Sequence, residues 1–250
     1  MTKLKINIKW FDELLPEGML IPSSTLISGP GGTGKPLVEF GFVAAWLKAG
    51  GSLIGIPLQY PKNELVKTAM KKLYDMDIEN YQGKVVYIQF DPDISGYKKT
   101  GDDILKSNMV IPQIWDETIE EAENMLDKTN LGIMVFGSAL NLLLFSKTYK
   151  DNILNKLKDI LQYDKNRTYV FAVSTSAFAN EIKILENVAD NLMFIRMGKS
   201  MKLFLKIDRM KEVGFQKKEK EVPISEEMFK EINEIAEATR MIRIPEIMKI

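Results

Sequence analysis

A glycine-rich segment at residues 28–36 contains the residue types that hold phosphate. It reads Ser-Gly-Pro-Gly-Gly-Thr-Gly-Lys-Pro and lies between an apolar run at residues 24–27 and a helical pattern at residues 37–47. In such a strand–turn–helix context, backbone N–H groups of the turn surround an anion, while a lysine and the helix N-terminus add positive charge. The spacing G-x-x-x-x-G-K is complete. We therefore predict a nucleotide phosphate site formed by Gly29, Pro30, Gly31, Gly32, Thr33, Gly34, Lys35 and Pro36.

Position 36 departs from this pattern, which has Ser or Thr after the lysine. The usual hydroxyl ligates Mg²⁺ and the usual backbone N–H joins the phosphate cradle, whereas Pro36 has neither group. Proline is well tolerated in the first turn of a helix, so the local fold is not threatened. From the loop alone two interpretations stay open, a triphosphate site that has lost catalysis and a loop that binds nothing.

Composition excludes several classes of function. The 250 residues contain no Cys and no His, which removes thiolate metal sites, thiol nucleophiles and Ser-His-Asp hydrolases. Lys+Arg and Asp+Glu balance at 34 each, so no basic field argues for nucleic acid. No apolar run is long enough to span a membrane, and Lys3, Lys5 and Lys9 interrupt any apolar N-terminal signal. We expect a protein of the cytoplasm.

Strand and helix patterns alternate along the chain. Buried strands are predicted at residues 24–28, 52–56, 84–90, 131–136 and 168–173, and helices at residues 36–49, 63–76, 116–129, 149–163 and 225–241. Residues 91–111 are predicted to be a long surface excursion, and residues 192–196, 201–207 and 220–222 to be antiparallel strands at the edge of the sheet. The alternation predicts one α/β domain over residues 1–250 with a mostly parallel central sheet. Within it, residues 225–250 form a C-terminal helix and an apolar tail.

Four segments, taken in their order, resemble the KaiC/RadA-type branch of the RecA-like ATPases. They are residues 11–18, the loop with its preceding strand at residues 25–35, and residues 185–192 and 205–211. The resemblance implies a RecA-like three-layer sandwich of archaeal type, ATP or ADP as the ligand, and a homo-oligomer. It also implies that Arg209 and Lys211 match a basic pair that reaches a neighbour's nucleotide. We favour the interpretation that both residues are charges facing outward on an edge strand.

The family's catalytic positions are occupied by residues of the wrong type. The carboxylate pair that polarises the attacking water is replaced by Gln59 and Tyr60, and the Walker B aspartate is replaced by Gly137. Glutamine cannot accept the proton of the attacking water, and tyrosine stays protonated near neutrality, so neither replaces the carboxylates. Together with Pro36, three positions therefore lack a group that ATP hydrolysis requires. Phosphoryl transfer depends on the metal and the base together. We predict no catalytic residue and no metal ligand, and therefore a chain that binds ATP or ADP weakly, holds Mg²⁺ poorly and does not hydrolyse ATP.

Two other functions are kept open. A slow or oligomerisation-dependent ATPase could use Asp91 or Asp93 as its carboxylate, and a recombinase-like DNA binder could use loops at residues 146–150 and 174–180. A protein or peptide partner could bind at the edge of the sheet or through the tail at residues 241–250, whose alternating Ile and Met would add as a strand. A nucleic-acid partner and a membrane are not expected.

Overall fold

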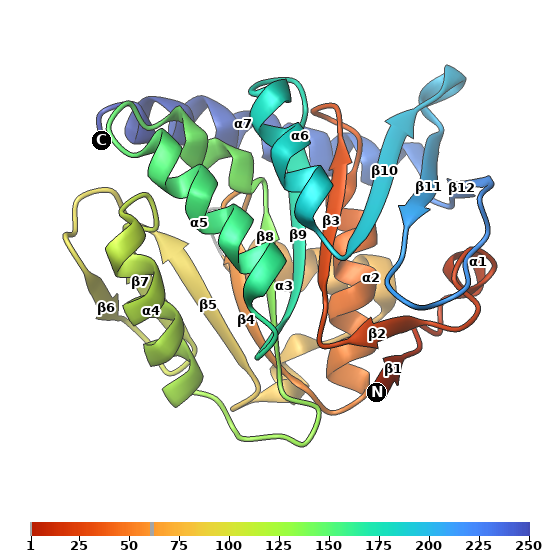
Figure 1. The fold of residues 1–250 in the computed structure, drawn as a ribbon, viewed down its shortest axis with the longest axis horizontal. Coiled ribbons are helices and arrows are strands. Elements are labelled where there is room, and N and C mark those ends of the chain that lie inside the picture. The colour runs from red at the N-terminus through yellow and green to blue at the C-terminus, as the bar shows by residue number, and fades with distance from the viewer. Residues whose placement is uncertain (1, 61–62) are drawn as a thin grey trace.

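One large β-sheet, whose strands are mostly parallel, organises the chain. The computed structural model describes residues 2–60 and 63–250. Within these residues ten strands form the sheet, in the order β12-β11-β10-β3-β9-β8-β4-β5-β7-β6 (Figure 1). Neighbours from β10 to β7 pair in parallel, while β10–β11, β11–β12 and β6–β7 pair antiparallel. The prediction of a mostly parallel sheet with antiparallel edge strands is confirmed.

The elements lie close to their predicted positions. The strands of the large sheet are β3 (Ser24–Gly29), β4 (Ser52–Pro57), β5 (Val85–Phe90), β6 (Tyr97–Lys99), β7 (Ile104–Ser107), β8 (Ile133–Ser138), β9 (Thr168–Ser174), β10 (Asn191–Met197), β11 (Leu203–Arg209) and β12 (Glu219–Val222). A small second sheet pairs β1 (Thr2–Leu4) with β2 (Met19–Ile21). The helices are α1 (Lys9–Asp12), α2 (Lys35–Lys48), α3 (Asn63–Tyr74), α4 (Pro112–Asn124), α5 (Lys150–Tyr163), α6 (Ala179–Val188) and α7 (Glu226–Ile247). Short 3₁₀ helices lie at Ile78–Tyr81, Leu140–Phe145 and Lys199–Met201.

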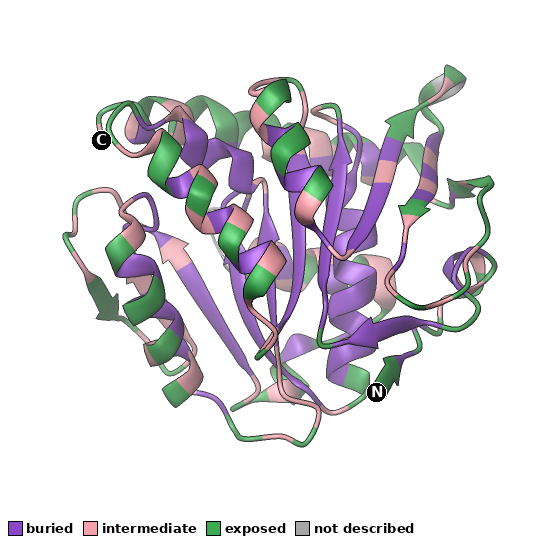
Figure 2. Cartoon of the chain, viewed as in Figure 1, coloured by how far each residue is buried: buried purple, intermediate pink, exposed green. Residues whose placement is uncertain are grey.

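Helices cover both faces of the sheet and make the predicted three-layer sandwich. Helices α4, α5 and α6 bury Trp115, Ile153 and Ile182 against one face, and α2 and α3 bury Phe40 and Val66 against the other (Figure 1). The inner strands are buried on both sides, which explains why they read as continuous apolar runs in the sequence (Figure 2). Among the described residues no helix is both long and apolar enough to cross a membrane.

The prediction of a surface excursion at residues 91–111 is wrong. This segment contains β7, which pairs in parallel with β5, and β6, which pairs antiparallel with β7. Leu105 and Ser107 are fully buried, so the segment widens the sheet. The strand is only four residues long and includes a lysine, and such a short mixed pattern is too weak a periodic signal to stand out among polar neighbours.

Two expectations about the later part of the chain also need correction. Strand β10, expected to be antiparallel, pairs in parallel with β3 on its inner side and antiparallel only with β11. The tail is not an extended segment, because α7 continues to Ile247 with Pro245 inside it. Ile247 is fully buried and Ile244 packs beside it, three residues earlier on the same helical face. A strand added by the tail to a sheet edge is therefore ruled out in this structure.

Candidate functional site

The predicted phosphate loop connects β3 to α2 at the carboxyl edge of the parallel strands. Gly34, the residue before α2, has a φ of 59°, and a Cβ atom there would lie 2.7 Å from Cδ1 of Leu203. Glycine is therefore required by both conformation and space. Pro36 lies in the first turn of α2, as the sequence predicts. Ligand sites of open α/β sheets occur at this edge, so the loop has the expected position.

Lys35 is turned into its own loop. Its side chain is buried, and its ammonium group donates to the carbonyls of Gly29 (3.1 Å) and Pro30 (2.5 Å) and to Oγ1 of Thr33 (3.2 Å). An ammonium group has three donors, so all of them are engaged. The Gly31 N–H donates to Oγ of Ser176 at 2.8 Å. Burial lowers the pKa of Lys35 to about 7, against an opposing effect of Glu39. The Lys35 ammonium group and the Gly31 N–H are thus bonded within the chain.

Glu39 is a functional candidate that sequence reasoning missed. It lies one turn after Lys35 on α2 and is fully buried. Ser138 donates its hydroxyl to Oε2, and Oε1 has no partner among the described residues. Burial raises the pKa of Glu39 to about 8. The signal in the sequence was one acidic residue within an otherwise apolar helix.

The space that a side chain would take at position 137, the predicted Walker B position, is filled. A Cβ atom on Gly137 would lie 2.7 Å from Cδ1 and 2.9 Å from Cγ of Leu140. The carboxylate at the end of β8 comes instead from Glu39, across the sheet–helix interface. Its Oε2 accepts from Ser138, and burial raises its pKa, which favours the neutral form and makes it a poor metal ligand.

Tyr60 and Gln59, the occupants of the predicted carboxylate pair, have different surroundings. The Tyr60 ring is buried 5.7 Å from that of Phe40, and burial, with a smaller contribution from Glu39, raises its pKa. Tyr60 is therefore a neutral core residue. Gln59 lies at the wall of a cleft beside the phosphate loop.

That cleft has a volume of about 130 Å³ and is lined by both the loop and α7. Its walls come from the loop, from the carboxyl ends of the strands and from α7; they include Gly31, Gly32, Lys35, Gln59, Ala139, Asn141, Ser174, Ser176, Ala236, Glu237, Arg240 and Ile244. The contribution of α7 was not foreseen from the sequence.

The other basic and acidic candidates are engaged away from the cleft. Arg209 donates to the carbonyl of Ala189 at 2.8 Å, and Lys211 lies 3.4 Å from the Asp190 carboxylate. Asp91 pairs with Lys106 at 3.2 Å. Within the chain, Arg209 and Lys211 therefore tie β11 and the segment after it to the end of α6.

Magnesium does not fit the residues of this site. Position 36 offers no hydroxyl, position 137 offers no carboxylate, and the Glu39 carboxyl group is fully buried with Oε2 bonded to Ser138. Among residues 2–60 and 63–250, no group of three or more acidic side chains could hold a metal ion.

A phosphate-binding loop after an inner strand of a parallel sheet, with helices on both faces, defines a P-loop protein of RecA-like fold. The family model of the ATPase KaiC matches residues 4–236, and the chain belongs to this family. The fold is similar to that of a KaiC-like protein from the hyperthermophilic archaeon Pyrococcus horikoshii OT3. The TM-score is 0.67 at 17% identity, over 90% of this chain and 95% of that chain. No curated protein matches.

Proposed function

We propose that this KaiC-family chain binds ATP or ADP weakly, does not hydrolyse ATP, and acts through its nucleotide-dependent or constitutive contacts with a protein partner. The observation that carries the proposal is the end of β8, where Leu140 occupies the space of the Walker B side chain. Hydrolysis needs a metal and an activated water together. The residues at positions 36, 59 and 137 supply neither.

The first test is ATP turnover. With ATP and Mg²⁺ we expect no release of phosphate above the buffer blank, because the groups that hold the metal and accept the proton are missing. The Lys35→Ala variant, prepared in parallel, measures contaminating ATPase. Turnover by the wild type that disappears in Lys35→Ala would overturn the proposal.

Position 36 gives a second prediction, on affinity. We expect wild-type ADP binding in the high micromolar range or weaker, and Pro36→Thr to bind Mg²⁺-ADP roughly tenfold more tightly, because it regains an N–H and a hydroxyl. Pro36→Ala is the matched control, since it restores the N–H alone. Isothermal titration of the three proteins measures the effect. Submicromolar, magnesium-dependent binding by the wild type would contradict the expectation.

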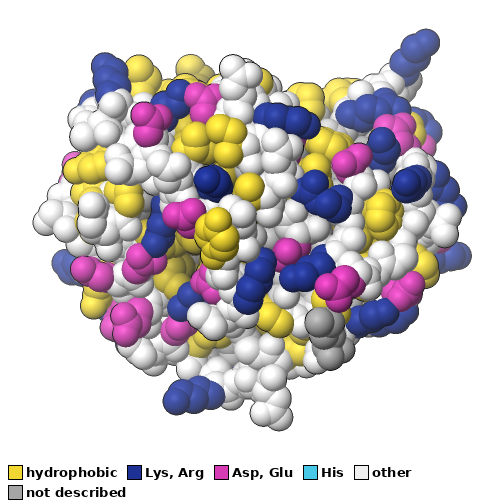
Figure 3. Space-filling view, viewed as in Figure 1, with side chains coloured by type: hydrophobic (Ala, Val, Ile, Leu, Met, Phe, Trp, Pro, Cys, Tyr) yellow, Lys and Arg dark blue, Asp and Glu magenta, His cyan; other side chains and the backbone are white. Residues whose placement is uncertain are grey.

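The protein-contact part of the proposal is supported by exposed apolar side chains on α7. Met241 is 77% exposed and Ile242 is 58% exposed on the helix that borders the cleft. A nucleotide in the cleft would lie beside this helix. DNA binding has less support, because Lys and Arg are interspersed with Asp and Glu on the face formed by α4, α5 and α6 (Figure 3).

A further inference from the structure

We propose that Arg240 of α7 belongs to the phosphate site and supplies the positive charge that Mg²⁺ supplies at metal-dependent sites, so that the cleft takes a nucleoside di- or triphosphate free of metal. The inference rests on the proposed nucleotide binding and adds to it a binding residue and the form of the ligand.

The charges around the cleft are the first argument. Among the described residues that line it, the cations are Lys35 and Arg240, and Glu237 is the acid. A di- or triphosphate brings several negative charges, and the residues of the loop do not fit a magnesium ion. Lys35 lies deep in the loop, where its donors already meet protein oxygens. Arg240 is the remaining cation on the cleft wall.

Its position relative to the loop is the second argument. The Nη1 atom of Arg240 lies 3.9 Å from the place that a Cβ atom on Gly31 would take, and Oδ1 of Asn233 lies 3.7 Å from the equivalent place on Gly32. Helix α7 therefore runs beside the phosphate-binding turn. A planar guanidinium forms paired hydrogen bonds to phosphate oxygens, which suits it to this position.

Arg240 is also free to turn toward a ligand. Its Nη2 lies 2.7 Å from Glu237, one turn earlier on the same helix, and both side chains are about half exposed at 47% and 54%. An exposed pair of this kind contributes little to stability. A phosphate carries more negative charge than one carboxylate, so it competes well for the guanidinium.

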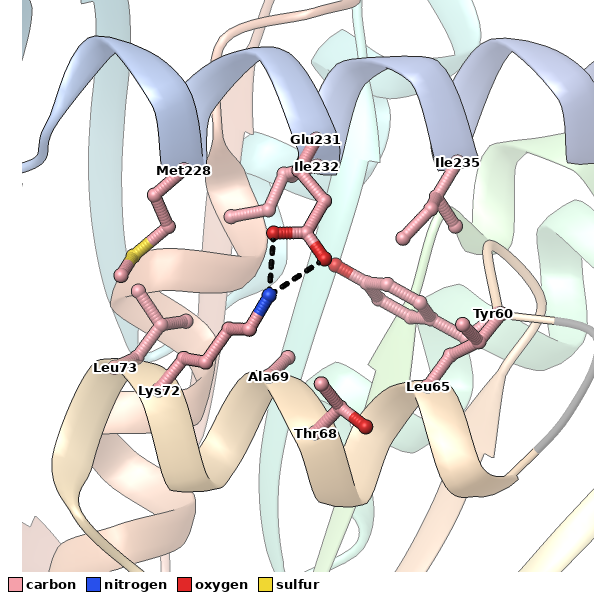
Figure 4. Close-up of a pocket in the computed structure, with 10 residues that line it drawn as sticks. All are labelled: Tyr60, Leu65, Thr68, Ala69, Lys72, Leu73, Met228, Glu231, Ile232 and Ile235. Atoms are coloured by element: carbon pink, nitrogen blue, oxygen red, sulfur yellow. Dashed lines mark hydrogen bonds and ion pairs between the residues drawn. The ribbon is translucent and has the colours of Figure 1, made fainter.

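The helix that carries Arg240 is fixed at both ends. Phe229 and Ile232 are buried in the core on the α2–α3 side of the sheet, and Ile247 is buried in the core on the other side. Lys72 of α3 holds Glu231 at 2.7 Å, with Met228, Ile232 and Ile235 of α7 facing α3 (Figure 4). Arg240 is therefore presented from a rigid element, which lowers the cost of ordering it on binding.

The experiment measures binding of ADP by isothermal titration, once with EDTA and once with excess Mg²⁺. For the wild type we expect binding in EDTA to equal or exceed binding in Mg²⁺. Arg240→Ala should weaken binding in EDTA at least tenfold, and Arg240→Lys should recover part of the loss, because it keeps the charge without the planar fork. Inorganic pyrophosphate, used as a second probe, should show the same losses because it presents the same phosphate chemistry.

Arg196→Ala is the matched control. Arg196 also pairs with an exposed glutamate, Glu219 at 2.5 Å, but it lies on β10 outside the cleft, so its loss should leave binding unchanged. If Arg240→Ala binds as the wild type does while Lys35→Ala loses binding, the inference is wrong and the proposed nucleotide binding stands. If wild-type binding requires Mg²⁺, the inference is again wrong and the proposed nucleotide binding again stands. If the wild type binds neither ADP nor pyrophosphate, both proposals fail. Circular dichroism of each variant shows whether it is folded.

Discussion

Replacing Glu39 with Gln should stabilise the folded chain by about 4 kcal/mol at pH 7.5 and change its stability little at pH 4. Burial raises the pKa of Glu39 from 4.5 to about 8 in the folded chain. The unfolded chain therefore loses this proton first as the pH rises. The contribution of this bound proton to the free energy of unfolding is fully present below pH 4.5 and is lost progressively between pH 4.5 and 8. From pH 4.5 to 7.5 the loss is three pH units at about 1.4 kcal/mol each, and glutamine, which cannot ionise, avoids it.

Urea unfolding of both proteins from pH 4 to pH 8.5 measures this difference directly. Burial lowers the pKa of Lys35 to about 7, which gives it the opposite pH dependence. Because Lys35 is present in both proteins, only the part of its titration that depends on Glu39 differs between them. Glu117→Gln, an exposed substitution on α4, is the control and should leave stability nearly unchanged across the range. A difference between wild type and Glu39→Gln that does not grow with pH would show that Glu39 is not held as a neutral acid.

Much of the fold can be predicted from the sequence because its strong signals are local. Each inner strand is buried on both faces and is therefore mostly apolar, and α3, α4, α5 and α6 each have a clear apolar side. Strand β7 and the last turns of α7 are the exceptions. In both, tertiary contacts decide the structure: β7 is paired between β5 and β6, and Ile247 is buried although Pro245 favours an earlier helix end.

The candidate site is less predictable, because its parts are distant in sequence. The loop at residues 29–36 and the substitutions at positions 36, 59 and 137 can be read directly, but their consequences for binding and catalysis remain predictions. Glu39 meets Ser138 across 99 positions of the chain. No periodicity connects these two residues, and an acid inside an apolar helix shows its importance only when its partners are seen. Arg240 likewise becomes a candidate only because α7 passes beside the phosphate-binding turn.

Restoring the Walker B aspartate with Gly137→Asp should destabilise the chain by at least about 3 kcal/mol and should not restore hydrolysis. The new Cβ atom would lie 2.7 Å from Leu140, and the new carboxyl group would be buried next to that of Glu39. Overpacking and a second buried acid each cost free energy. Gly137→Ala introduces the Cβ atom without the charge, so its smaller loss isolates the steric part.

The pairing with Glu39 makes this prediction specific. If one carboxylate has replaced the other, Gly137→Asp should be tolerated better when Glu39 is absent. In a double-mutant cycle with Glu39→Ala, measured by urea unfolding at pH 7.5, we expect the double variant to be more stable than the sum of the two single-variant changes predicts, by about 1–3 kcal/mol. Losses that add to within about 0.5 kcal/mol would show that the two positions are independent. A favourable coupling would indicate that Glu39 of α2 takes the place of an acid at the end of β8 and faces the protein core instead of a metal ion. Gly137→Asp alone would then be unable to rebuild an ATPase site.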